Sequence, residues 1–310
     1  MSESNMSVCR RRSTPHASLA VLGLKLRQLD LFAPIRQLLR IPQKIVRYSP
    51  VDKLFDAFVA LLAGAHGLVE INSRLRSDPA LQAAFGRSAC AEQSVVQDTL
   101  DAATAANITQ MEQALEQIYR AHSRGYVHDY SGSLQILDAD LSGQPCGPKA
   151  AFATKGYFAR QRNRRGRQLG RVVAGRYDEI VVDRLFPGNV QLNTTLPELI
   201  IAAEATLELD EDEQRRQRTL VRVDAGGGSQ SDLNWLLARG YQILAKEYSA
   251  ERAAKLAASV REWVADPRHP GREMGWVTIP ASEYVRPVRR MAVRCKKANG
   301  QWGVGVLITR

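Results

Sequence analysis

The sequence predicts a mixed α/β sheet, preceded by an all-α N-terminal domain and followed by a β-rich segment. Three observations predict this order. Residues 30–124 repeat apolar side chains at helical spacing, residues 134–246 combine strand-like runs with helical ones, and residues 275–309 have the pattern of short strands between turns. Strands that are followed by alternating helices and strands are typical of a mixed sheet.

Composition limits the class of protein. A chain of 310 residues with 45% hydrophobic residues is expected to form about two globular domains. The four cysteines lie far apart and lack zinc-ligand spacing, which argues against a disulfide framework or a structural zinc and favours a reducing cytoplasm. No segment approaches the roughly 20 apolar residues of a membrane span, so no membrane partner is expected.

The net charge of +11 is the first indication of a polyanionic partner such as DNA. Charge alone is a weak indication, because basic chains also arise for solubility. We expect residues 1–29 to be a loose basic N-terminus and residues 30–125 to be a helical domain for DNA binding or assembly. A turn near Gly86 to Cys90 is consistent with a helix-turn-helix and equally with a plain helical bundle.

Capping patterns predict where several helices begin. Ser49 precedes Pro50 and Asp52, a combination typical of a helix N-terminus. Two capping boxes, Thr109 to Glu112 and Thr195 to Glu198, predict further helix starts. An Ala-rich helix is predicted over residues 250–264, ahead of the β-rich residues 275–310.

The first strand predicted for the sheet leads through Ile136 and Leu137 into Asp138 and Asp140, and we interpret Leu141 to Gly143 as its end. Residues 168–174 and 178–186 have the pattern of two further strands, which together with the first form a meander.

Residues 219–246 form the clearest local pattern, a βαβ unit. The apolar run that ends at Val223 is followed by Asp224 and then by three glycines, where the backbone can turn without a Cβ clash. A helix with Leu233, Leu236 and Leu237 on one face follows, and a second strand begins after Gly240. In open parallel sheets, ligands bind at the carboxyl ends of strands, where this pattern places Asp224.

Asp140 and Asp224 are the candidate catalytic and metal-binding residues. Each follows an apolar run, so if their strands are neighbours the two carboxylates meet at one rim of the sheet. Two close carboxylates need a cation, and oxygen ligands favour Mg²⁺ (or Mn²⁺) for phosphodiester displacement. Asp138 shares a strand face with Asp140 and is expected to support the metal from outside its direct ligands. The alternative is that each aspartate only forms a turn.

A dense basic segment follows the first strand. Eight basic residues fall within 22 positions that contain no acid, and such a density repels itself unless a polyanion lies against it. We favour contact with the DNA backbone over a solvated hairpin. The candidate DNA-binding residues are Lys155, Arg160, Arg162, Arg164, Arg165, Arg167 and Arg171, with Arg176 completing the run.

Four co-linear segments carry a resemblance to a known family: LDADLSG at 137–143, TKGYFARQRNRRGRQLGRV at 154–172, YDEIVVDRLFPGN at 177–189 and the βαβ unit at 221–246. They resemble DDE-type insertion-sequence transposases, which have a ribonuclease H-like catalytic domain.

The resemblance implies that the first and fourth strands are neighbours, with Asp140 and Asp224 as the first two catalytic acids. It implies Mg²⁺-dependent cutting at inverted-repeat ends, strand transfer by a homo-oligomer on double-stranded DNA, and a bacterial, nucleoid-associated location. It also implies a catalytic core over 126–274 and a β-rich insertion over 275–310.

The sequence departs from the family at the third acid. The family pattern requires a glutamate in the arrangement Y-x2-R-x3-E-x6-K, which is absent here, and Glu247, Glu262, Glu273 and Glu283 stand outside any such motif. The expectation is therefore a C-terminally truncated transposase that binds DNA and is defective in catalysis.

Two alternatives remain. One is a DNA-binding regulator without catalysis. The other is a phosphatase similar to haloacid dehalogenases, because Ile136 to Asp140 resembles their hhDxD opening, which would make Asp138 a nucleophile.

Overall fold

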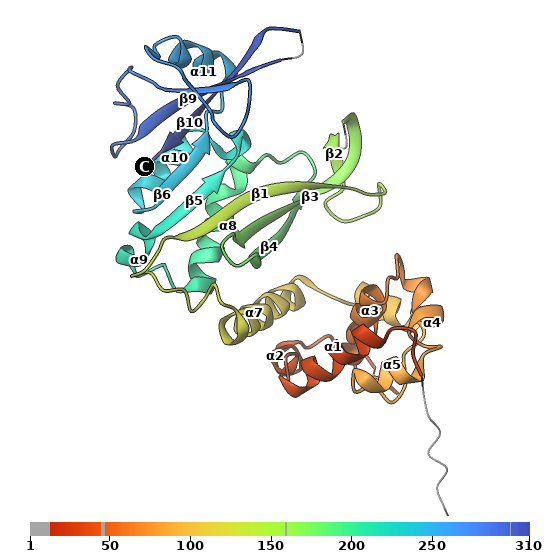
Figure 1. Cartoon of the computed structure of the whole chain (residues 1–310). Coiled ribbons are helices and arrows are strands. Elements are labelled where there is room, and N and C mark those ends of the chain that lie inside the picture. Colours follow the sequence, from red (N-terminus) through yellow and green to blue (C-terminus); the bar gives the residue numbers. More distant parts are fainter. Residues whose placement is uncertain (1–12, 45–46, 159, 298) are drawn as a thin grey trace, which may run out of the picture. The chain divides into compact units, whose positions relative to one another are not determined.

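The computed structural model describes residues 13–44, 47–158, 160–297 and 299–310, which divide into two compact units on either side of the bond between Ala121 and His122. The first unit is helical and the second contains the sheet (Figure 1). The helices of the first unit are α1 (Ala17–Gln28), α2 (Ala33–Leu38), α3 (Pro50–Leu62), α4 (Ile71–Arg74), α5 (Pro79–Ala84), α6 (Gln93–Asp101) and α7 (Ala105–His122), with a 3-10 turn at Leu68–Glu70.

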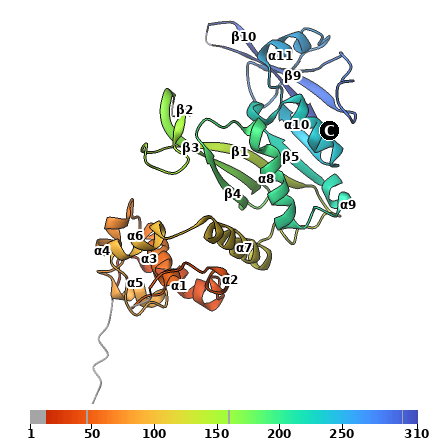
Figure 2. The same ribbon diagram turned by 180° about the vertical axis from the view of Figure 1, so that it is seen from behind.

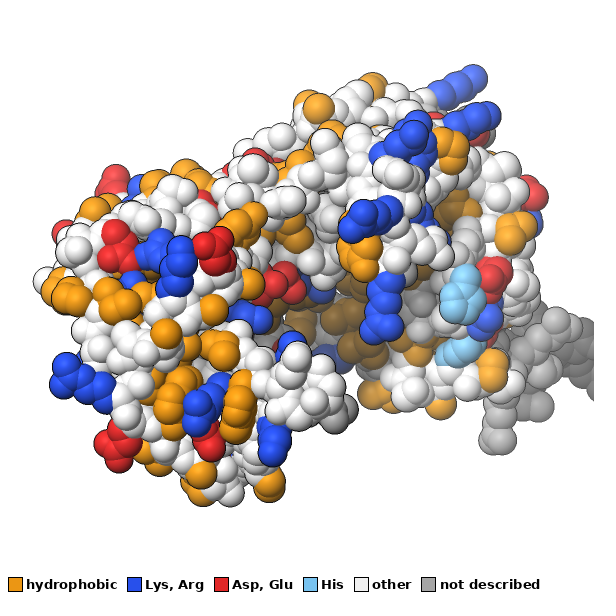
Figure 3. Space-filling view, turned by 90° about the horizontal axis from the view of Figure 1, so that it is seen from above, with side chains coloured by type: hydrophobic (Ala, Val, Ile, Leu, Met, Phe, Trp, Pro, Cys, Tyr) orange, Lys and Arg blue, Asp and Glu red, His pale blue; other side chains and the backbone are white. Residues whose placement is uncertain are grey.

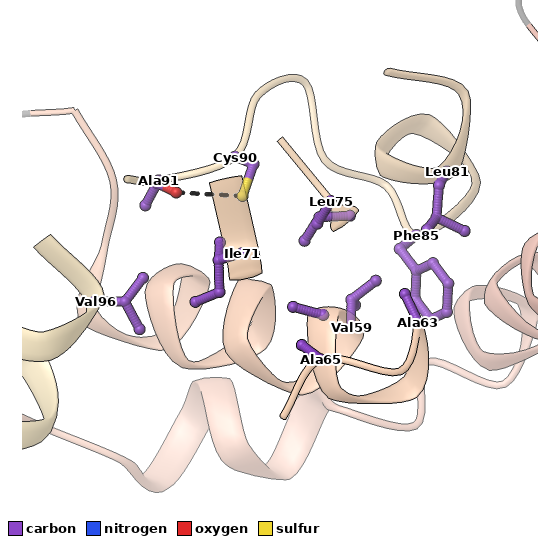
Figure 4. Close-up of a cluster of buried hydrophobic side chains, with 11 residues drawn as sticks. Val59, Ala63, Ala65, Ile71, Leu75, Leu81, Phe85, Cys90, Ala91 and Val96 are labelled. Carbon is purple, nitrogen blue, oxygen red and sulfur yellow. Dashed lines mark hydrogen bonds between the residues drawn. The ribbon is translucent and has the colours of Figure 1, made fainter. Parts of the chain in front are cut away.

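The core of the helical unit is a cluster of buried apolar side chains from α3 to α6 and their connections, including Val59, Ile71, Leu75 and Phe85 (Figure 4). The predicted start of α3 is confirmed, because the Ser49 side chain accepts a hydrogen bond from the Asp52 N–H and the two residues form a capping box. Leu19, Ala20 and Leu26 of α1, among others, pack against this core while still partly exposed.

Two expectations for this unit need correction. Residues 17–28 were expected to belong to a loose N-terminus, but they form α1, in which Gly23 lies directly against the ring of Phe85. Residues 1–12 of that segment lie outside the described residues. The helix predicted to start at Thr109 begins a turn earlier, because Thr104 and Asn107 cap it reciprocally.

The second unit is built on a ten-stranded sheet with the order β2-β3-β1-β5-β6-β10-β9-β8-β7, and β4 pairs with β3 beside β2 (Figures 1 and 2). Strands β1 and β5 are parallel, as are β5 and β6. The strands are β1 (Gln135–Pro145), β2 (Thr154–Phe158), β3 (Gln161–Ala174), β4 (Glu179–Pro187), β5 (Thr219–Val223), β6 (Gln242–Lys246), β7 (Val264–Ala265), β8 (Arg272–Trp276), β9 (Arg289–Lys296) and β10 (Trp302–Thr309).

The expected mixed α/β architecture with preceding helices is confirmed, while several element bounds differ. Strand β1 does not end at Leu141 to Gly143, because its pairing with β3 continues to Pro145. The helix expected to start at Thr195 begins at Leu192. The helix expected to reach residue 264 stops at Ala257. Ser259, just beyond it, accepts two hydrogen bonds from Thr278, one from its N–H and one from its hydroxyl.

The longer helices of this unit cover one face of the sheet. Helix α8 (Leu192–Leu207) contacts β1, β3 and β4, α10 (Gln230–Ala238) contacts β6 and α8, and α11 (Ala250–Ala257) contacts β9 and β10. Short α9 (Glu213–Gln217) precedes β5. The strand residues beneath them, such as Leu137, Val221 and Ile308, are fully buried. Alternate strand residues therefore point to the opposite face, which these three helices leave uncovered.

No described helix is both long and apolar enough to cross a membrane.

Candidate metal and DNA-binding site

The structure brings Asp140 and Asp224 together. Strands β1 and β5 run parallel with Asp138 opposite Arg222 and Ala139 opposite Val223. One residue further along, the two strands reach Asp140 and Asp224. Both residues are exposed, and both belong to the face that the helices leave uncovered.

The loop after β5 holds Asp224 in place. Asp224 is the N-cap of a single 3-10 turn over Ala225–Gly227, and its carboxylate accepts a hydrogen bond of 2.7 Å from the Gly226 N–H. Gly228 lies so close to the end of β6 that a Cβ there would stand 2.2 Å from the Lys246 carbonyl oxygen. Close packing therefore requires a glycine at position 228. Asp224 forms the turn and also lies beside Asp140, so the two roles are compatible.

The surroundings of Asp140 raise the pKa of its carboxyl group. Although the residue is exposed as a whole, protein atoms crowd its carboxyl group, and this partial desolvation raises the pKa of Asp140. The N–H of Leu141 donates a 2.7 Å hydrogen bond that lowers this pKa, and the charge of Asp224 raises it. Such a carboxylate pair gains from a bound cation, and its oxygen donors suit Mg²⁺ or Mn²⁺.

Asp138 lies two residues before Asp140 and has a partner of its own. Arg222 donates to both of its oxygens, at 2.5 and 2.6 Å. With both oxygens engaged by a guanidinium, Asp138 is poorly placed to attack a phosphate, which counts against the phosphatase alternative. Sequence reasoning missed Arg222, because its pairing with Asp138 depends on the register of two strands that lie 84 residues apart in the sequence.

The basic segment forms a hairpin of β2 and the first half of β3. Lys155, Arg160, Arg162, Arg164 and Arg165 are exposed along it. Figure 3 shows Lys and Arg side chains standing out where this hairpin projects in Figure 1, with few acidic side chains among them. Arg167 is half-buried, and its Nε has no hydrogen-bond partner among the described residues.

Arg171 differs from the other candidate DNA-binding residues. It forms two hydrogen bonds of 2.6 and 2.9 Å to Asp183, which stands opposite it on β4. Arg176 lies in the exposed turn between β3 and β4. The segment contains no acid in its own sequence, but the neighbouring strand supplies one, so Arg171 has an anionic partner, unlike Arg162, Arg164 and Arg165, for which no ion pair is found in the described ranges.

Phe158 anchors the hairpin and was not identified from the sequence. Its side chain is 1% exposed. A Cβ added at any of four glycines on three strands and the loop after β4 would lie within 3.0 Å of its ring; they are Gly143, Gly156, Gly166 and Gly188. The signal in the sequence was the set of glycines within otherwise strand-forming runs, which marks a close approach by another group.

Of the four glutamates named in the search for a third acid, three have arginine partners. Glu247 is buried beside Arg252, Glu283 pairs with Arg252 and Arg290, and Glu273 pairs with Arg294. Glu262 is exposed. In the described parts of the chain, no set of three His, Cys, Asp or Glu side chains is grouped closely enough to hold a metal ion.

Comparisons with known proteins give only distant similarities. No family model matches the chain, and no curated protein matches it. Among solved structures, the chain is similar to a piggyBac transposase synaptic complex with hairpin DNA, with 12% identity, a TM-score of 0.46, and coverage of 96% of this chain and 63% of that one.

It is also similar to a pre-cleavage Mos1 transpososome, with 13% identity and a TM-score of 0.25, over 66% of this chain and 60% of that one. The Mos1 transposase paired-end complex with the left transposon end gives 11% identity and a TM-score of 0.24, over 65% and 60% of the two chains. The chain thus spans about three fifths of the length of these proteins. A functional assignment depends on its own residues and their geometry.

Proposed function

We propose that this chain is a transposase-like DNA-handling protein with a ribonuclease H-like sheet. Support comes from the strand order β4-β3-β1-β5-β6, in which the first strand of the predicted meander neighbours the strand that precedes Asp224. That is the adjacency which the resemblance to insertion-sequence transposases implies. Action on inverted-repeat ends and assembly as a homo-oligomer on DNA are parts of this proposal.

The observation that carries the proposal is the adjacency of Asp140, within β1, and Asp224, directly after β5, because the two strands are parallel neighbours up to the pair Ala139 and Val223. In the proposed site these two carboxylates hold Mg²⁺ or Mn²⁺. Bound there, the metal would stabilise the charge of a phosphodiester undergoing displacement. Asp140 lies within β1 and Asp224 directly follows β5, and the hydrogen bonds from Leu141 and Gly226 orient one oxygen of each carboxylate.

DNA is proposed to run along the β2–β3 hairpin toward the acid pair. Within β3, Arg165, Arg167 and Arg171 share one face by alternation, and Arg171 stands opposite Asp140 on β1. The row therefore leads from exposed cations to the carboxylates. Phosphate contacts of this kind give sequence-independent affinity, as expected for the protein's contact with the DNA backbone.

A metal titration of the purified chain tests the site. We expect Mn²⁺ to bind the wild-type chain and Asp224→Asn to weaken binding by about tenfold or more, because one of two charged ligands is removed. Asp178→Asn is the matched control: it removes the same charge from an exposed turn, and asparagine tolerates the positive φ of 57° found there. Equal affinity in the wild type and Asp224→Asn would refute the site.

DNA binding without cleavage is the second candidate function. The observation in its favour is that the pair has no third candidate ligand grouped with it in the parts that the structure describes. Supercoiled plasmid incubated with the chain and Mg²⁺ distinguishes the two candidates. Nicking that disappears with Asp224→Asn supports catalysis, whereas a gel shift without nicking supports binding alone.

A further inference from the structure

The acid pair is surrounded by three cations, each of which is turned away from it. Arg171 stands directly opposite Asp140 on β3, and Arg222 precedes Asp224 by two residues on the same face of β5. Ala245 of β6 stands opposite Val223 of β5, so Lys246, the next residue of β6, lies beside Asp224. Side chains at such positions lie about 4.5–7 Å apart at Cβ, well within the reach of an arginine or a lysine.

Both arginines are held by carboxylates outside the pair. Asp183 binds Arg171 through two hydrogen bonds, and Asp138 binds Arg222 in the same two-pronged manner. The flat guanidinium matches a carboxylate in this geometry, so each clamp fixes direction as well as charge. Lys246 extends over Gly305 of β10, where a Cβ would stand 3.6 Å from the lysine Cε.

Asp140 and Asp224, by contrast, have no ion-pair partner within the described ranges. Two aspartates beside three cations would ordinarily form ion pairs with them, and a cation bound in that way would occupy the oxygens that a metal needs. The surrounding carboxylates compete successfully for the arginines.

We infer that Asp183 and Asp138 are positioning residues that keep Arg171 and Arg222 off the acid pair and so keep its oxygens available to a divalent cation. This inference rests on the proposed function of the same site. Asp183 lies on β4, and β3 separates β4 from the strand of Asp140, so Asp183 acts only through Arg171. It belongs to the segment 177–189 that carries the resemblance, but the resemblance assigns it no role.

Mn²⁺ alone is the probe, measured by isothermal titration calorimetry on the full chain at low salt. In Asp183→Asn, we expect Arg171 to turn to Asp140 and the Kd for Mn²⁺ to rise about fivefold, with a smaller rise at high salt. The double variant Asp183→Asn/Arg171→Gln removes the intruding cation and is expected to return to within about twofold of the wild type.

Glu198→Gln is the matched control, because it removes one negative charge and a partner of Arg184, which lies on the helix-covered face of β4. A loss of affinity equal to that of Asp183→Asn would mean that only net charge matters, and this would overturn the inference. Unchanged affinity in Asp183→Asn would overturn it as well.

Absence of Mn²⁺ binding in the wild type would instead count against the proposed function. The crystal structure of Asp183→Asn then decides the inference on its own. An Arg171 guanidinium paired with Asp140 supports it, and one left in solvent refutes it.

Discussion

At the scale of single residues, His128 links the stability of the sheet unit to pH. It is 7% exposed. Its Nε2 lies 3.2 Å from the Ser133 carbonyl oxygen and its Nδ1 lies 2.6 Å from the Tyr177 hydroxyl. A carbonyl can only accept, so Nε2 carries the proton and Nδ1 of the neutral ring accepts from Tyr177. Burial lowers the pKa of His128 below 6.5, because the neutral ring is favoured there.

The sign of the pH dependence follows from this shift. Since the unfolded chain binds the proton more readily, the contribution of His128 is fully present above about pH 6.5 and is lost as the pH falls toward the lower folded-state pKa. Urea unfolding monitored by tryptophan fluorescence should show this loss between about pH 7.5 and 5.5. His128→Gln should make the free energy of unfolding depend less on pH in this range. His122 is exposed, and His122→Gln should leave the pH dependence unchanged.

At the scale of elements, the β2–β3 hairpin depends on one aromatic anchor. Phe158→Ala should destabilise the hairpin by about 3–5 kcal/mol, the usual cost of emptying a buried aromatic site. Hydrogen exchange of the β2 amides should accelerate, and DNA affinity should fall because the arginines are no longer held in place. The neighbouring Tyr157 is 62% exposed, so Tyr157→Ala should leave exchange nearly unchanged. Similar exchange in both variants would contradict the anchoring role.

The start of α7 gives a second prediction at this scale. Thr104→Ala should lower the free energy of unfolding by about 1 kcal/mol, because Thr104 caps the helix together with Asn107. Thr109→Ala should cost much less, since Thr109 lies inside the helix, where alanine is favoured. The denaturant midpoints of the two variants measure these losses. A larger loss of stability in Thr109→Ala than in Thr104→Ala would indicate that Thr109 is the cap.

These elements show what the sequence could predict. The βαβ unit and the ends of its strands followed from apolar spacing and glycine positions, both of which are local. The partners Arg171–Asp183 and Asp138–Arg222 depend on strand register between segments up to 84 residues apart, so no local pattern revealed them. Strand β2 and the first half of β3 were missed because arginines obscure the apolar alternation, and Phe158 is the one fully buried apolar side chain among the residues described there.

At the scale of the whole molecule, the excess positive charge should appear as a salt-dependent affinity for DNA. Arg162, Arg164 and Arg165 are exposed and are expected to contact phosphates. Replacing all three with alanine should reduce the slope of log K against log salt concentration by about 0.9 for each phosphate that is no longer neutralised. Arg171→Ala is the internal control, because Arg171 is already neutralised by Asp183 and should change the slope little. Fluorescence anisotropy over a range of salt concentrations measures both.

Strand β3 has a consequence for how the two proposed activities depend on each other. It runs without interruption from Gln161 to Ala174, so the exposed Arg162, Arg164 and Arg165 and the Arg171 beside Asp140 stand on one continuous element, roughly 20–30 Å apart. DNA held at one end and a metal ion held at the other are then coupled by thermodynamic linkage. If bound DNA changes the affinity for Mn²⁺ by a certain factor, bound Mn²⁺ must change the affinity for DNA by the same factor. Paired titrations, each ligand in the presence and absence of the other, should return one shared coupling factor.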